Sequence, residues 1–325
     1  MTLPPGPRAP RIVQGIYALT RPQRGMRLMR ERYGDAFAIN VPIFGRAVVI
    51  SDPGQIKQVF TTSTDILDNA DRDLGRVLGK GSMFALRGEN HQKQRKLLVP
   101  PFHGRRLAAY EKIIEDETIR ELATWPQDQP FPVQPSMMRI TLNAILRAVF
   151  GAEGAEFDEL RDLLPRFVEL GSRFAVLPIP QGTWGPWRKF WAMRREYDAI
   201  VERLIAKADD LDERDDVLAM LLQSRYDDGS SMRHSDIADQ LLTLLTAGHE
   251  TTATTLAWAV ERVRRHPKIL NDLVAEVDAG EKTLREATIL EVQRIRPVID
   301  LVIRQIRPTV WTWARGRCPR ATRSS

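Results

Sequence analysis

Apolar residues recur with the 3.6-residue spacing of a helix along most of the chain. This pattern predicts helices over 21–33, 89–98, 105–125, 135–150, 156–170, 186–209, 215–225, 235–265, 267–279 and 283–296. Two short apolar runs, 37–41 and 47–50, predict a β-hairpin, and Ser51, Asp52 and Pro53 then form a typical helix start. The sequence therefore predicts a mainly α fold with a small β element in its N-terminal part.

The predicted helix over 235–265 is apolar nearly all round, through 241–247 and 253–260, and we expect it to be buried. Its centre reads AGHETT from 247 to 252. A glycine inside a helix costs about 1 kcal/mol relative to alanine, and β-branched threonines add to the cost. One hypothesis is that a flat ligand lies against Gly248, while Glu250 and Thr251 pass protons to it. The alternative is a close helix crossing between small residues.

Three further groups of charged residues are candidates for chemistry. Glu291 and Arg294 are three positions apart on a predicted helix, so they share a face and can form an ion pair. His91 and Arg95 are four apart and can both donate to carboxylates or phosphates, whereas Lys93 and Lys96 point elsewhere. Arg304 is a further carboxylate-binding candidate. Each group also fits an ordinary solvated helix face or, for Arg304, the start of a basic tail.

Composition sets limits on the class of protein. The 325 residues are 43% apolar, which is enough for one large domain or two ordinary ones. A single cysteine, Cys318, excludes an intrachain disulfide framework and a multi-cysteine zinc site, and it fits a cytoplasmic protein. No apolar stretch approaches the roughly 18 residues of a membrane span. Ala253 stands where an H-E-x-x-H zinc motif needs its second histidine, so we expect no metal-ligating side chains there.

The positive charge lies at the C-terminal end. The net charge is +6, and residues 304–325 hold six arginines and no carboxylate, so the rest of the chain is neutral. We expect residues 1–303 to form the folded domain and residues 304–325 to be a basic, disordered tail. A shifted reading frame is an alternative origin for this tail. Anion or nucleic-acid binding through its arginines is a further functional alternative.

Taken in order, these motifs resemble those of a cytochrome P450. Residues 247–252 resemble the oxygen-binding helix motif A-G-x-[DE]-T-[ST], and Glu291 with Arg294 resembles the E-x-x-R pair. Residues 88–95, with His91 and Arg95, resemble the segment that holds the haem propionates, and Arg304 matches a later propionate arginine. The resemblance covers residues 4 to about 304.

The resemblance implies a mainly α, prism-shaped P450 domain with a small β-sheet. It implies haem b, O2, and electrons from NAD(P)H delivered by a ferredoxin or flavodoxin-type partner, for oxygen insertion into an apolar small molecule. Glu250 and Thr251 would supply protons, and Ala247, Gly248 and Thr251 would face the haem. His91, Arg95 and Arg304 would bind its propionates. No membrane span and no specific nucleic acid are implied. Segments 74–84 and 166–184, with Met83, Phe84, Phe167, Phe174 and Trp184, would line the access side.

The sequence departs from the family at the axial ligand. The family's cysteine lies in a loop F-x-x-G-x-R-x-C-x-G, and the residues flanking Cys318 match none of its other fixed positions. Cys318 follows Arg294 by only 24 positions. We therefore expect the C-terminal part of the P450 domain, with its cysteine loop, to be missing from this chain and its activity to be lost. An inactive remnant or a helical binding protein without haem is the alternative function.

Overall fold

A computed structural model describes residues 3–41, 45–69, 74–102, 106–151, 154–176, 182–307, 310–313 and 316–319. The chain divides into two compact units, one of residues 1–72 with 301–325 and one of residues 73–300. Helices make up most of the described residues, and the strands among them pair in twos. The predicted mainly α fold is confirmed.

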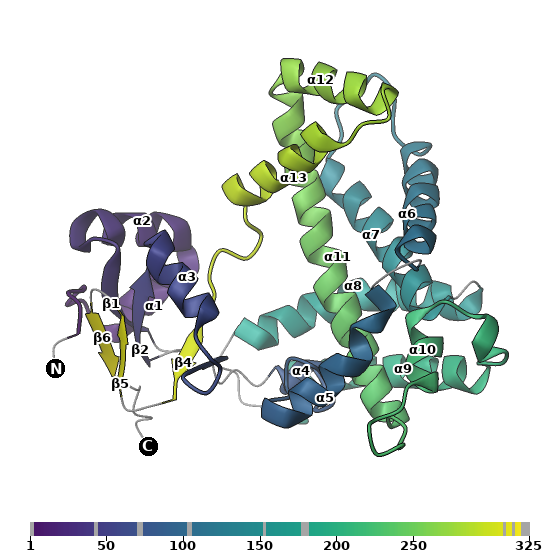
Figure 1. Cartoon of the computed structure of the whole chain (residues 1–325), viewed down its shortest axis with the longest axis horizontal. Coiled ribbons are helices and arrows are strands. Elements are labelled where there is room, and N and C mark those ends of the chain that lie inside the picture. Colours follow the sequence, from purple (N-terminus) through teal and green to yellow (C-terminus); the bar gives the residue numbers. More distant parts are fainter. Residues whose placement is uncertain are drawn as a thin grey trace. The chain divides into compact units, whose positions relative to one another are not determined.

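The first unit combines a hairpin with three helices (Figure 1): α1 (Arg11–Thr20), α2 (Pro22–Tyr33), β1 (Ala36–Val41), β2 (Gly45–Ile50) and α3 (Pro53–Thr61). β1 and β2 pair antiparallel, with Ala36 opposite Ile50, which confirms the predicted hairpin. Asp52 caps α3 by accepting a hydrogen bond from the Gln55 N–H at 2.9 Å. The sequence pattern missed α1, because Pro10 before it provides no capping side chain and Gly15 interrupts it.

Short strands occur in the segment that was expected to be a disordered tail. β4 (Arg304–Ile306) pairs antiparallel with β3 (Leu67–Asn69), and β5 (Val310–Trp313) pairs with β6 (Gly316–Pro319). An ion pair between Arg307 and Asp68 joins the same two segments as β4 and β3. The partner strand of β4 is remote in sequence, so local periodicity gave no indication of it. Residues 308–309, 314–315 and 320–325 lie outside the described residues.

The second unit is built from helices. In chain order they are α4 (Gly75–Leu78), α5 (Gly88–Leu98), η1 (Pro100–Phe102), α6 (Arg106–Leu122), α7 (Val133–Phe150), α8 (Ala155–Val176), α9 (Pro186–Ala206), η2 (Leu211–Glu213), α10 (Val217–Gln223), α11 (His234–Arg264), α12 (Pro267–Asp278) and α13 (Thr283–Ile295). Each helix predicted between residues 89 and 296 is present, although α8 continues well past its predicted end at residue 170. Within the described part of the chain, no helix has the length and apolarity needed to cross a membrane.

The core of the second unit gathers around α7, α8, α9 and α11. Phe167 of α8 stacks on Phe190 of α9 with ring centroids 4.9 Å apart, and Phe174 stacks on Trp187 at 4.1 Å. All four side chains are buried. Phe167 and Phe174 were expected to line the ligand access side, and that expectation is wrong, because this face of α8 packs against α9. Trp184, from the same expectation, is exposed.

The long helix α11 has two different environments. From Ile237 to His249 most side chains are buried, and Leu241 and Leu242 are fully inaccessible to solvent. Farther along, Leu256 and Trp258 are 37% and 36% exposed. The prediction of a helix buried along its whole length is therefore wrong for its C-terminal half. Figure 1 shows α7 beside α11, with α12 and α13 near the C-terminal end of α11. α7 also covers one side of the C-terminal half, where Ala253 is fully buried in a cluster with Met137 and Ile140.

Candidate functional site

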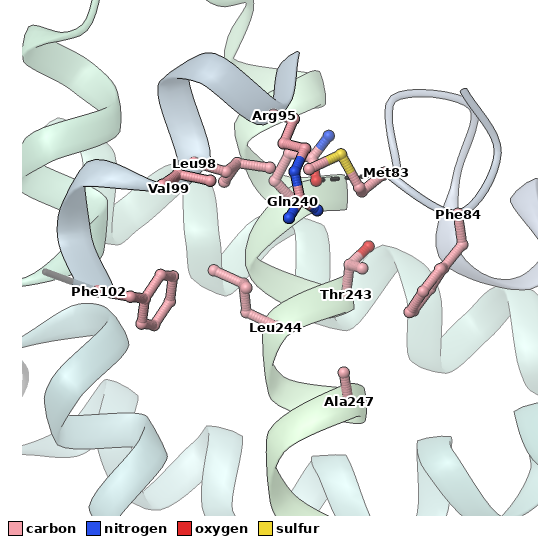
Figure 2. Close-up of a pocket in the computed structure, with 10 residues that line it drawn as sticks. All are labelled: Met83, Phe84, Arg95, Leu98, Val99, Phe102, Gln240, Thr243, Leu244 and Ala247. Carbon is pink, nitrogen blue, oxygen red and sulfur yellow. Dashed lines mark hydrogen bonds between the residues drawn. The ribbon is translucent and has the colours of Figure 1, made fainter. Parts of the chain in front are cut away.

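A pocket opens beside the buried half of α11 (Figure 2). It encloses about 250 Å³, slightly below the ~300–1,000 Å³ of typical small-molecule pockets. The loop after α4, the end of α5, η1 and α11 supply its lining. The lining residues are Met83, Phe84, Arg95, Leu98, Val99, Phe102, Gln240, Thr243, Leu244 and Ala247. The lining is mostly apolar, so the pocket suits a small apolar ligand.

Arg95 is the one cationic side chain in this lining. It has no hydrogen-bond or ion-pair partner among the residues that the structure describes. The neighbouring lysines of α5 differ: Lys93 pairs with Glu89 at 2.8 Å and Lys96 with Asp227 at 2.6 Å. The prediction that these lysines point elsewhere is consistent with those pairs. Arg95 is thus available to bind an anionic group at the edge of the pocket.

His91 lies one helical turn before Arg95 and is partly exposed. Within the described residues its imidazole has no polar partner either, but it is not part of the pocket lining. His91 and Arg95 therefore have the predicted four-residue spacing on α5. Only Arg95 lines the pocket in this structure.

Ala247 and Gly248 face different surroundings. Ala247 lines the pocket, as the predicted ligand-facing helix requires. A Cβ on Gly248 would lie 2.5 Å from Cδ1 of Ile145 on α7. Gly248 therefore serves the crossing of α11 and α7, and the expectation that a flat ligand lies against it is not met in this structure. The alternative interpretation, a close helix crossing, describes Gly248 correctly, because residues one apart on a helix point in directions about 100° apart.

The same crossing contains a buried polar pair that sequence reasoning missed. The Thr141 hydroxyl donates to the Met137 carbonyl oxygen at 3.0 Å, so its free lone pair can accept the Nδ1–H of His249 at 2.8 Å. His249 is buried, and burial lowers the pKa of its imidazole. A neutral histidine in the middle of AGHETT thus belongs to the packing of α11 against α7.

Glu250 and Thr251 follow Ala247 along α11. The Thr251 hydroxyl donates to the Ala247 carbonyl oxygen at 2.7 Å, and α11 continues without a break through this turn. The carboxylate of Glu250 is exposed, so water can hydrate it. Neither residue is part of the pocket lining. Their proton-supplying role stays a prediction.

Glu291 and Arg294 form the predicted ion pair. The Arg294 guanidinium donates two hydrogen bonds of 2.7 Å to the Glu291 carboxylate and lowers its pKa. The side chains are 56% and 69% exposed, so water screens the pair. In this structure the pair lies on the surface of α13 and closes no buried network.

Arg304 lies in the first unit. It sits in β4 opposite Asn69, donates to the Ile303 carbonyl oxygen at 3.2 Å, and places its guanidinium 5.7 Å from the centre of the Phe60 ring. Its predicted binding of a propionate stays a prediction.

The resemblance predicts a haem, and the pocket residues fit one only in part. The small side chain of Ala247, the apolar wall of Leu98 and Leu244, and the unpaired guanidinium of Arg95 suit a flat macrocycle with carboxylates. Residues 73–300, which hold the pocket, include no cysteine, so this unit supplies no axial thiolate. The described residues also contain no cluster of three metal-ligating side chains. The described residues of this unit therefore do not provide a complete haem-thiolate site by themselves.

Comparison with known proteins resolves the family. A family model described as cytochrome P450 matches residues 4–309. The chain is 51% identical over 324 residues to a putative cytochrome P450 138 of Mycobacterium tuberculosis, covering 98% of this chain and 74% of that protein. It is 38% identical over 315 residues to a putative cytochrome P450 135B1 of the same organism, covering 92% of this chain and 66% of that protein.

Solved structures share the fold. A retinoic acid-bound cyanobacterial CYP120A1 matches with a TM-score of 0.83 and 20% identity, over 98% of this chain and 75% of that chain. A cytochrome P450 named CYP102L1 matches with a TM-score of 0.80 and 23% identity, over 98% of this chain and 76% of that chain. Identities this low support the fold alone. The match to the family model and the identity to the mycobacterial relatives establish the family. The chain belongs to the cytochrome P450 family.

Proposed function

We propose that the fold of this chain serves haem-dependent monooxygenation, in which one oxygen atom of O2 is inserted into an apolar small molecule, and that the chain by itself lacks this activity because residues 73–300 supply no axial thiolate. Family membership supports the reaction class. One observation carries the choice of ligand: the Ala247 face of α11 closes a mostly apolar pocket of about 250 Å³. Electrons would come from NAD(P)H through a ferredoxin or flavodoxin-type partner.

The residues of the site have distinct proposed roles. Met83, Phe84 and Leu244 would exclude water from the ligand. Arg95 would bind a haem carboxylate, with His91 as a second donor one turn away. Glu250 and Thr251, which follow Ala247 on α11, would hold and move protons at their carboxylate and hydroxyl oxygens.

A second candidate function is a helical binding protein that holds an apolar ligand without haem. The observation that favours it is the lack of any cysteine in residues 73–300, together with flanks of Cys318 that do not match the family's loop. Under this hypothesis the pocket binds its ligand, but the chain does no redox chemistry on its own.

Haem reconstitution followed by spectroscopy separates the two functions. The purified chain is mixed with haem, reduced and exposed to carbon monoxide. The strongly red-shifted Soret band of a thiolate-ligated haem would support the monooxygenase. No retained haem would support the haem-free binding protein, whereas retained haem with an unshifted band would show that haem binds without a thiolate ligand. Either result would mean that this chain by itself is not a monooxygenase.

Arg95 offers a test that does not need activity. Arg95→Leu should reduce haem retention on a desalting column, because a carboxylate loses its charged partner. Lys96→Leu is the matched control, since Lys96 is an adjacent cation that pairs with Asp227. Equal retention by both variants would contradict the proposed role of Arg95.

A further inference from the structure

The loop that brings Met83 and Phe84 to the pocket is held by side chains of α11. Asp239, Gln240 and Thr243 occupy one stripe of this helix, and Ala247 continues the same stripe into the pocket. Gln240 is completely inaccessible to solvent, and Ser82 of the loop is as well. Polar groups buried this deeply are costly unless their hydrogen bonds are satisfied.

Gln240 acts on the loop backbone in the way a peptide group would. Its Nε2 donates to the Gly81 carbonyl oxygen, and its Oε1 accepts the Met83 N–H at 3.2 Å. The reverse orientation of the amide would place donor against donor and acceptor against acceptor. One side chain therefore fixes the backbone on both sides of Ser82 and sets the starting point of Met83.

A second set of hydrogen bonds runs in one direction from the loop to the helix. The Phe84 N–H donates to Ser82 Oγ at 3.2 Å, Ser82 Oγ pairs with Thr243 Oγ1 at 2.7 Å, and Thr243 Oγ1 donates to the Asp239 carbonyl oxygen at 2.6 Å. Because Thr243 uses its hydrogen on Asp239, the Ser82 hydroxyl is the donor to Thr243. The chain of bonds ties Phe84 to α11.

Asp239 anchors the start of the loop. Its carboxylate accepts the Gly81 N–H at 2.8 Å and pairs with Arg194 of α9. Arg194 also donates to the Leu78 carbonyl oxygen at 3.2 Å. These contacts hold the loop from both its α9 and α11 sides.

Two glycines make this close approach possible. Gly79 has a φ of +100°, and a Cβ there would overlap the Asp239 carboxylate. A Cβ on Gly81 would lie 2.9 Å from the Cα of Asp236, which is backbone and cannot move aside. The loop can therefore rest directly on α11 only with glycine at both positions.

We propose that Gln240 is a positioning residue that selects the ligand of the pocket by fixing Met83 and Phe84 opposite Ala247. The proposal rests on the proposed function insofar as the pocket takes an apolar ligand. Gln240 itself lines the pocket through an amide whose polar atoms are already engaged by the loop, as Figure 2 shows for its bond to Met83. The wall that meets the ligand is therefore preorganised, and the pocket length is set by the register of the loop on α11.

The test combines backbone protection with ligand selectivity in the full chain. Gln240→Met removes both hydrogen bonds at nearly equal volume, and Gln92→Met, at an exposed position of α5, is the matched control. In the variant we expect faster hydrogen exchange at the amides of 81–84. The neutral dye N-phenyl-1-naphthylamine, displaced by 1-hexanol and by 1-decanol, should show the ratio of the two alcohol affinities changed by about tenfold.

Gln240→Glu provides a rescue within one protein. Burial raises the pKa of a carboxyl, so at about pH 5 the buried carboxyl side chain of this variant is neutral and can donate to the Gly81 carbonyl oxygen and accept from the Met83 N–H. The amide protection of 81–84 and the ratio of alcohol affinities should then match those of the unaltered chain. At about pH 9 the carboxylate repels the Gly81 carbonyl oxygen, and both should be lost. The unaltered chain at the same two pH values is the control. The comparison of Gln240→Glu at the two pH values therefore tests the positioning role of Gln240 even if Gln240→Met fails to fold.

Each outcome has a definite meaning. Unchanged protection and an unchanged alcohol ratio in Gln240→Met, or a Gln240→Glu chain that does not respond to pH, would overturn the positioning role. Failure of the unaltered chain to bind the dye or either alcohol would instead overturn the proposed apolar pocket. In that case the amide protection of 81–84 in the variants still decides whether Gln240 holds the loop.

Discussion

The two halves of α11 differ although their sequences look alike. α7 packs along both halves, but the N-terminal half also contacts α9, carries the loop with Met83 and Phe84, and forms one side of the pocket. The C-terminal half leaves Leu256 and Trp258 more than a third exposed. Both halves have apolar residues nearly all round the helix. Periodicity thus shows that a helix forms, but the neighbours that cover it are determined by tertiary packing.

The ion pairs near the two halves differ in the same way. Arg194 and Asp239 have side chains only 12% and 10% exposed and connect α9 to the pocket half of α11. Glu291 and Arg294 are largely exposed on α13. A buried pair leaves an uncompensated charge when one partner is removed, whereas water compensates an exposed one. This contrast gives the strongest way to test the comparison.

Removal of one arginine from each pair should have unequal effects. Arg194→Met should lower the free energy of unfolding by about 3–5 kcal/mol, because the Asp239 carboxylate stays buried without its partner. Arg294→Met should leave stability unchanged within error. Urea unfolding followed by circular dichroism measures both. Adding Asp239→Asn to Arg194→Met should restore part of the lost stability, because it removes the unpaired carboxylate. Equal losses of stability in Arg194→Met and Arg294→Met would contradict the difference between the two halves.

Leucine truncation tests the packing of the two halves directly. Leu241 is fully buried, so Leu241→Ala should cost about 2–5 kcal/mol through lost contacts and a residual cavity. Leu256→Ala should cost less than about 1 kcal/mol, because Leu256 is already partly hydrated. The same unfolding experiment applies. A large loss for Leu256→Ala would mean that the C-terminal half is covered in solution.

The buried histidine at the junction of the halves predicts a dependence of stability on pH. Burial lowers the pKa of His249 below its ordinary value of 6.5. Just below pH 6.5 the imidazole is therefore protonated to a greater extent in the unfolded chain than in the folded chain. Stability should therefore fall as pH drops below about 6.5. In His249→Gln the fall over this range should be smaller, as measured by thermal unfolding at several pH values. His266→Gln alters an exposed histidine and should keep the original slope.

Much of the fold could be predicted from the sequence, because helix spacing and caps are local properties. The hairpin, the cap at Asp52 and the long helix through Gly248 all follow from neighbouring residues. The pairing of β4 with β3 and the exposure of Leu256 depend on residues remote in sequence, so no local pattern contained them. Gly248 illustrates what a local pattern does not contain. A glycine that leaves room for a ligand and a glycine that leaves room for the Ile145 side chain look identical in sequence.

The candidate site was predicted in part. Arg95 and Ala247 reach the pocket together, and Met83 and Phe84 line it as expected. The loop-holding residues Asp239, Gln240 and Thr243 were missed. Their signal was present: three polar residues at i, i+1 and i+4 interrupt an otherwise apolar buried stretch, and Gly79 and Gly81 flank a single lysine. Polar residues of this kind in a buried helix need partners, and a glycine pair permits a loop to come close enough to provide them.

The pocket on the covered half of α11 is the central claim, and substitution at Ala247 tests it most directly. Ala247→Phe should fill the cavity and weaken N-phenyl-1-naphthylamine binding by at least about tenfold in a fluorescence titration. Thr252→Phe, at an exposed position outside the lining, should bind the dye as the unaltered chain does. Unchanged dye affinity in Ala247→Phe, with Thr252→Phe weakened instead, would place the ligand elsewhere on the molecule and contradict the account.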